Sequence, residues 1–123
     1  MRFNTSILVA LAMVPLVGLL SLTGCSGVLP ATLEEKLETN GTEKDHLAAA
    51  KAYQNKAREL EAEAVEFETA AAKVSRDMDP KGFERAALRM GGQKKRHDAK
   101  EMLELYAAEL GQAHALHSKT EPQ

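Results

Sequence analysis

A seven-residue repeat of small and large apolar side chains is the strongest constraint on the fold of this chain. A small apolar residue or methionine recurs every seven positions from residue 50 to residue 78, and a large apolar residue follows three positions after each alanine. The members are Ala50, Ala57, Ala64, Ala71 and Met78, with Tyr53, Leu60, Phe67 and Val74 between them. Such a repeat predicts a long helix that packs along one seam against another helix. An ordinary Ala-rich amphipathic helix is the alternative.

Two boundary signals predict that a second helix follows after a short turn. Thr42 is a good N-cap and Asp45 completes a capping box, so the first helix is expected over residues 42–78. Pro80 cannot continue that helix but suits the first position of a new one, with Asp79 as its N-cap. A connection of two or three residues makes the two helices antiparallel.

The second helix is expected over residues 80–117 and carries a less regular apolar stripe. Its members step by four and three positions and are Ala99, Leu103, Tyr106, Leu110, Ala113 and His117. We therefore expect an all-α fold, an antiparallel two-helix hairpin over residues 42–118 followed by a tail at residues 119–123. The alternation of alanine with large residues is similar to that of Ala-based antiparallel coiled coils.

The register of this hairpin follows from the turn. Folding the chain at residues 79–80 places Tyr53 opposite Tyr106 and Phe67 opposite Gly92, where the glycine leaves room for the ring. The same register places a run of glutamates opposite lysines and an arginine. Exposed ion pairs contribute less than about 1 kcal/mol each, so these charges select the register rather than hold the hairpin together.

A two-helix hairpin buries little apolar surface, so we expect this one to self-associate or to bind another protein. Leu47, Val65, Met102 and Leu105 flank the predicted seam and would be partly exposed in a single hairpin. A two-fold dimer that forms a four-helix bundle is the simplest assembly that covers them.

The N-terminus reads as a secretory signal peptide over residues 1–24. Arg2 supplies a positive charge, residues 7–20 are apolar, and the small residues Thr23 and Gly24 follow. A transmembrane helix is the alternative, but the apolar stretch is shorter than the roughly 20 residues of a span and contains Pro15.

The four residues Leu22, Thr23, Gly24 and Cys25 resemble the lipobox of bacterial lipoproteins. The resemblance implies that Cys25 is lipidated, becomes the first residue of the mature protein and is its membrane anchor. Residues 25–41 would then be a tether, in which Thr32 is a possible cap for a short helix. Ser26 resembles the residue that directs lipoproteins to the outer membrane, which implies a location in the cell envelope, facing the periplasm.

The mature chain also resembles small Ala-rich helical lipoproteins of unassigned role, which carry no transferable activity. The murein-linked lipoproteins of the outer membrane are similar lipidated helices, but they end in a lysine, whereas this chain ends in Gln123. We therefore expect an interaction or structural module of the envelope, whose partner is a second copy or another envelope protein. A periplasmic lipoprotein that binds a metal or small ligand is the alternative.

Catalytic and nucleic-acid-binding motifs are missing from the sequence. It has no nucleophile elbow and no phosphate-binding glycine loop, so we expect no enzyme. Removing residues 1–24 removes one basic residue and no acidic one, which leaves a net charge of −3 and does not favour nucleic-acid binding. Cys25 is the only cysteine, so no intrachain disulfide is possible.

Three histidines form the one candidate metal site. His114 and His117 share a helical face, and the hairpin register brings His46 to the same end, near Glu43 and Asp45. Imidazoles with a carboxylate are suitable ligands for Zn²⁺ or Cu²⁺. The alternative is that these histidines only complement the dipole at a helix C-terminus.

Overall fold

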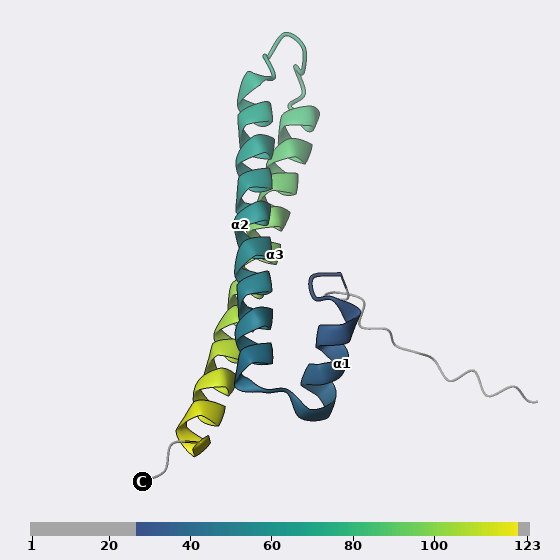
Figure 1. Cartoon of the computed structure of the whole chain (residues 1–123). Helices are drawn as coiled ribbons and strands as arrows, with labels where there is room; N and C mark the ends of the chain where they lie inside the picture. The colour runs from purple at the N-terminus through teal and green to yellow at the C-terminus, as the bar shows by residue number, and fades with distance from the viewer. Residues whose placement is uncertain (1–26, 121–123) are drawn as a thin grey trace, which may run out of the picture.

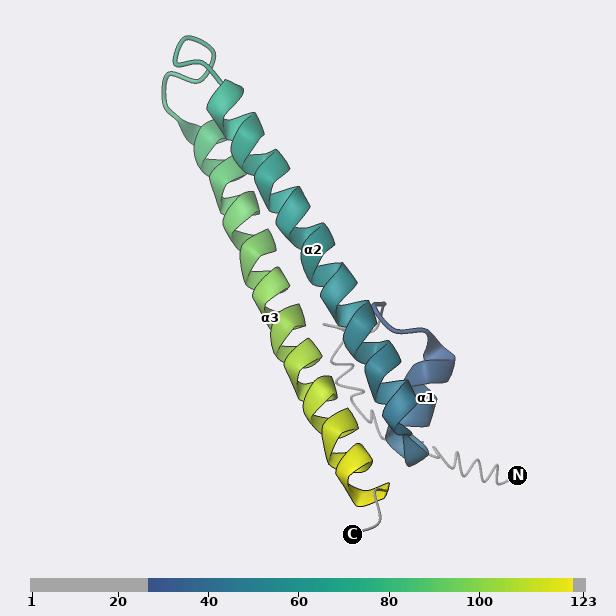
Figure 2. The same ribbon diagram turned by 60° about the vertical axis from the view of Figure 1, so that its left-hand side comes forward.

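The computed structural model describes residues 27–120, which form three helices and no β-strand. Helix α1 spans Ala31–Asn40, α2 spans Glu43–Lys73 and α3 spans Phe83–Thr120. Helices α2 and α3 pack as a long antiparallel pair, and α1 lies beside the half of α2 nearest its start (Figures 1 and 2). The all-α class and the antiparallel pair are confirmed. The predicted signal peptide, lipobox and Cys25 lie outside the described residues.

Helix α2 begins with the predicted capping box. The Thr42 hydroxyl accepts a hydrogen bond from the Asp45 backbone N–H at 3.3 Å, and the Thr42 N–H donates to Asp45 Oδ2 at 3.0 Å. The side-chain and backbone hydrogen bonds from Thr42 lower the pKa of Asp45, because they favour its charged form. Two of the donors at the helix start are thereby satisfied.

The predicted seam of α2 faces α3. The buried positions of α2 include Ala50, Tyr53, Ala57, Leu60, Ala64 and Ala71, while Phe67 and Val74 are half-buried. Met78, the last member of the repeat, is 79% exposed because α2 ends at Lys73, before the repeat does.

The connection between the long helices spans residues 74–82 and is longer than the predicted two or three residues. Gly82 adopts a φ of 73°, which favours glycine, and its N–H donates to the Asp79 carbonyl at 3.1 Å. This turn delays the start of α3 to Phe83. Asp79 still caps α3 from outside it, because its Oδ2 accepts from the Arg85 N–H at 3.0 Å. That hydrogen bond is the main reason why the pKa of Asp79 is lowered.

The buried stripe of α3 differs from the predicted one at every second position. Ala99 and Ala113 are buried and Tyr106 is half-buried, as expected. Three positions after each of these residues, the less exposed side chains are Met102, Glu109 and Leu116 instead of the residues one position later. Leu103 is consequently 46% exposed, Leu110 is 37% exposed, and His117 is exposed.

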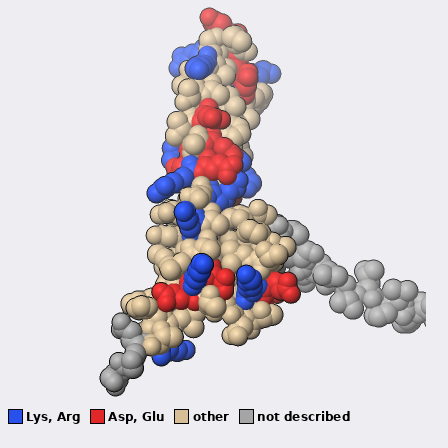
Figure 3. Space-filling model, in the orientation of Figure 1, with Lys and Arg blue, Asp and Glu red and all other residues tan. Residues whose placement is uncertain are grey.

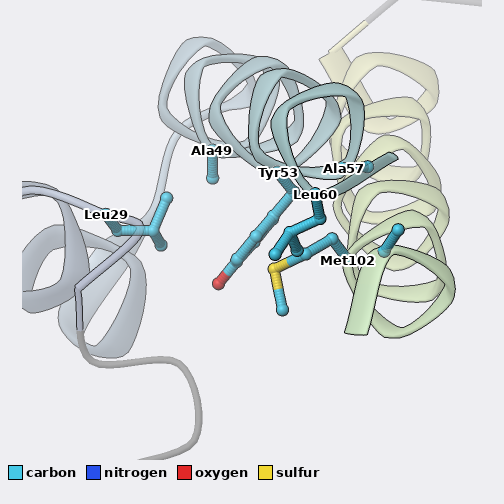
Figure 4. Close-up of a cluster of buried hydrophobic side chains, with 7 residues drawn as sticks. Leu29, Ala49, Tyr53, Ala57, Leu60 and Met102 are labelled. Carbon is cyan, nitrogen blue, oxygen red and sulfur yellow. The ribbon is translucent and has the colours of Figure 1, made fainter. Parts of the chain in front are cut away.

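Helix α1 lies in the segment that was expected to be a tether. Leu29, just before α1, is buried with Tyr53, Leu60 and Met102 in the main apolar cluster (Figure 4). Val28, Leu33 and Leu37 are half-buried against the same cluster, so four apolar side chains attach α1 to the helical pair. Pro30, not Thr32, occupies the N-cap position of α1.

Candidate functional site

Two cross-helix pairs join the open end of the hairpin, where α2 begins and α3 ends. His46 Nδ1 of α2 lies 2.6 Å from Glu109 Oε2 of α3, and both side chains are largely buried. His117 Nδ1 of α3 lies 3.3 Å from Glu43 Oε2 of α2, and both of these are exposed. Each long helix therefore contributes one histidine and one glutamate.

The predicted histidine site is only partly assembled. His114 and His117 line one shallow pocket of about 320 Å³ together with Glu43, whereas His46 is engaged with Glu109. Asp45 belongs to the α2 capping box. Over residues 27–120, no three His, Cys, Asp or Glu side chains are grouped so that they could hold a metal ion. The Zn²⁺ or Cu²⁺ hypothesis stays a prediction, which titration calorimetry would decide.

A cluster of ion pairs spans the middle of the hairpin (Figure 3). Arg96 contacts Glu61 Oε2 at 2.7 Å and both carboxylate oxygens of Glu68 at 2.9 Å, and Lys95 pairs with Glu63. The hydrogen bonds from Arg96 and Lys95 lower the pKa values of Glu68 and Glu63 respectively. The side chains of Arg96, Glu61 and Glu68 are about 45% exposed, so these pairs add little stability. They do connect the residues that the predicted register placed opposite each other.

Helix α1 covers one side of the hairpin only beside the first half of α2, and the opposite side is open (Figure 1). Leu105 is half-buried against the cluster that α1 completes. On the open side, Leu47, Leu103 and Leu110 form an exposed apolar row, which we call the leucine strip, and their exposed fractions are 45%, 46% and 37%. Leu47 and Leu110 also line the pocket that contains His114.

The leucine strip changes which residues are available to a partner. Leu47 and Val65 are exposed as predicted, but Met102 is only 5% exposed and Leu105 is half-buried. Leu103 and Leu110 take their place, although the sequence pattern assigned both to the seam. The sequence does contain a signal for Leu103 and Leu110. Ala99, Tyr106 and Ala113 recur every seven positions, and a seam that continues three positions after each of them, instead of four, leaves these two leucines outside it.

No helix in residues 27–120 is long and apolar enough to cross a membrane. Comparison of the chain with protein-family models, with curated proteins and with solved structures finds no match. The residues themselves therefore carry the functional argument.

Proposed function

We propose that this protein is a bacterial envelope lipoprotein, anchored by lipid on Cys25, whose helical pair acts as an interaction module. The observation that carries the proposal is the sequence Leu22, Thr23, Gly24 and Cys25 directly after an apolar run. The thiol of Cys25 would accept the lipid. Two or three acyl chains, at about 0.8 kcal/mol per buried CH₂ group, hold a protein firmly on a membrane, whereas one chain does not.

The packing of α1 supports a close approach of the helical pair to that membrane. Leu29, which is buried in the main apolar cluster, follows Cys25 by only four positions. Four residues reach at most about 14 Å, whereas sixteen free residues would reach about 50 Å. The module would therefore sit next to the lipid surface instead of at the end of a long tether.

The exposed apolar residues support an interaction role for the long helices. Their seam has the small-and-large alternation of an Ala-rich coiled coil, and such a seam buries little surface. The leucine strip lies beside it, between the Arg96 ion pairs and the pair formed by His117 and Glu43. We propose that a second copy covers this strip, most simply in a two-fold four-helix bundle.

Metabolic labelling with a fatty-acid probe in a bacterial host tests the anchor. Wild-type protein should be labelled and recovered with membranes, and Cys25→Ala should be neither, because the acceptor thiol is gone. Ser26→Ala is the matched control, since it leaves that thiol in place and should remain labelled. Equal labelling of wild type and Cys25→Ala would refute the proposal.

A further inference from the structure

The loop end of the hairpin carries the most exposed large apolar side chains of the described residues. Met78 is 79% exposed, Phe83 is 72% exposed and Met90 is 68% exposed. Phe83 and Met90 are seven residues apart and so share one face of α3, while Met78 lies in the adjoining loop. A single exposed apolar residue is ordinary, but three together at one end of a small protein indicate a contact surface.

The segment that forms this end has a net charge of +2 in an otherwise acidic protein. Residues 73–90 contain five basic and three acidic residues, whereas the chain from Cys25 onward has a net charge of −3. Asp79 is occupied by Arg85, whose Nε lies 3.4 Å from its Oδ2. Four exposed basic side chains share this segment with the apolar ones: Lys73, Arg76, Lys81 and Arg89. They outnumber its two exposed acidic residues, Asp77 and Glu84. Figure 3 shows Lys and Arg side chains on both sides of this end and acidic side chains at its apex.

We propose that this basic tip, made of Met78, Phe83, Met90 and the four exposed basic residues of the same segment, docks on an anionic membrane surface. Apolar side chains at the end of a helix can enter the boundary between headgroups and acyl chains, and Lys and Arg beside them attract anionic headgroups. The charge of the tip is complementary to such a surface. The long, flexible side chains of methionine also suit a fluid partner.

The position of α1 allows the tip and the lipid anchor to meet one membrane. Val28 lines a pocket with Leu60 of α2, and Lys73 at the end of α2 is thirteen residues further on. Thirteen helical residues span about 20 Å. A lipid on Cys25 and the tip would then make two neighbouring contacts. This geometric point rests on the proposed lipidation, but binding by the tip does not.

A single tryptophan tests the tip directly, because the chain contains none. Phe83→Trp would be placed in an unlipidated chain of residues 26–123, which contains every contact described above. With vesicles of phosphatidylcholine and phosphatidylglycerol, its emission should shift to the blue and be quenched by brominated lipid. Phosphatidylcholine alone should have little effect. Ala108→Trp, at an exposed position of α3 outside both the tip and the leucine strip, is the matched control, and its emission should not change with either vesicle.

Charge reversal then tests the electrostatic part. Each basic side chain near an anionic surface contributes about fivefold to binding, so Arg76→Glu with Lys81→Glu should weaken vesicle binding at least roughly 20-fold. Lys51→Glu with Lys100→Glu, on exposed helix positions away from the tip, should weaken it much less. An emission spectrum of the Phe83→Trp variant that stays unchanged with anionic vesicles would overturn the proposal. It would also be overturned by a shift that depends on protein concentration without vesicles, since that would show a contact between copies.

Discussion

Gly91→Ala gives a quantitative test of how closely the two long helices approach. Alanine is more favourable than glycine inside a helix by about 1 kcal/mol. A Cβ atom at Gly91, however, would lie 2.9 Å from two ring atoms of Phe67, so the ring must move. Overpacking of this kind costs about 1–3 kcal/mol. The substitution should therefore be neutral or destabilising by up to about 2 kcal/mol, instead of stabilising.

A double-mutant cycle separates the two contributions. In a Phe67→Ala background the ring is absent, so Gly91→Ala should recover the helical gain and stabilise by about 1 kcal/mol. Gly111→Ala is the matched control, because a Cβ there would have no atom within 4 Å. It should stabilise the protein by about 1 kcal/mol in either background.

Urea unfolding of residues 26–123, followed by far-UV circular dichroism, measures these free energies. The expected result is that Gly91→Ala stabilises the protein only in the Phe67→Ala background, whereas Gly111→Ala stabilises it equally in both. If Gly91→Ala stabilised the wild-type chain as much as Gly111→Ala does, the close contact between Phe67 and α3 would be refuted.

Three further predictions concern the strip, the loop and α1. Leu103→Glu should give a monomer in sedimentation with its helix content intact, and a dimeric Leu103→Glu variant would contradict the role of the strip. Met102→Glu, in contrast, should lower the free energy of unfolding by at least about 3 kcal/mol, because it places a charge at a buried position. The pKa of Asp79 is lower in the folded protein than the value of 3.8 for the unfolded chain, so the ionised side chain stabilises the fold at a pH above 3.8. This stabilisation is lost as the pH falls through the pKa of the folded protein. Wild type should therefore lose more stability than Asp79→Ala between about pH 5 and about pH 2 in urea titrations, and equal losses would contradict the cap. Leu29→Ser should release α1 from the helical pair, and because α1 is too short to be stable alone, trypsin should then cleave faster after Lys36. Unchanged cleavage would show that Leu29 does not hold α1 in place.

The α2 half of the fold could be predicted because several local signals agree there. Thr42 and Asp45 define the start, and the strict alternation of alanine with large residues leaves one face for the seam. The register also followed from the sequence, since Phe67 does pack on Gly91 and Gly92. These features depend on short-range spacing, which a sequence shows directly.

The seam of α3 was harder, because hydrophobicity favoured the wrong residues. Leu103 and Leu110 are more apolar than Met102 and Glu109, yet the latter pair faces α2. Glu109 is accommodated there because His46 pairs with it across the helices. A partly buried polar side chain that depends on a partner 63 residues away leaves no local trace in the sequence.

The packing of the short helix at residues 31–40 and the length of the turn could not be predicted, for a related reason. Helix α1 has ten residues and no side-chain cap hydrogen bond, so its stability comes from the packing of Leu29, Leu33 and Leu37 in and against the main apolar cluster. In the turn, Pro80 permits a helix start, but the bond from the Gly82 N–H to the Asp79 carbonyl delays it. Both outcomes are decided by tertiary contacts and by loop geometry, not by the propensity of single residues.

The mass of the N-terminal peptide of the protein purified from bacterial membranes tests the central proposal most directly. Lipidation predicts a chain that begins at Cys25 and carries the mass of lipid on that residue. A chain that retains Met1, or that is cut elsewhere and carries an unmodified Cys25, would contradict the account.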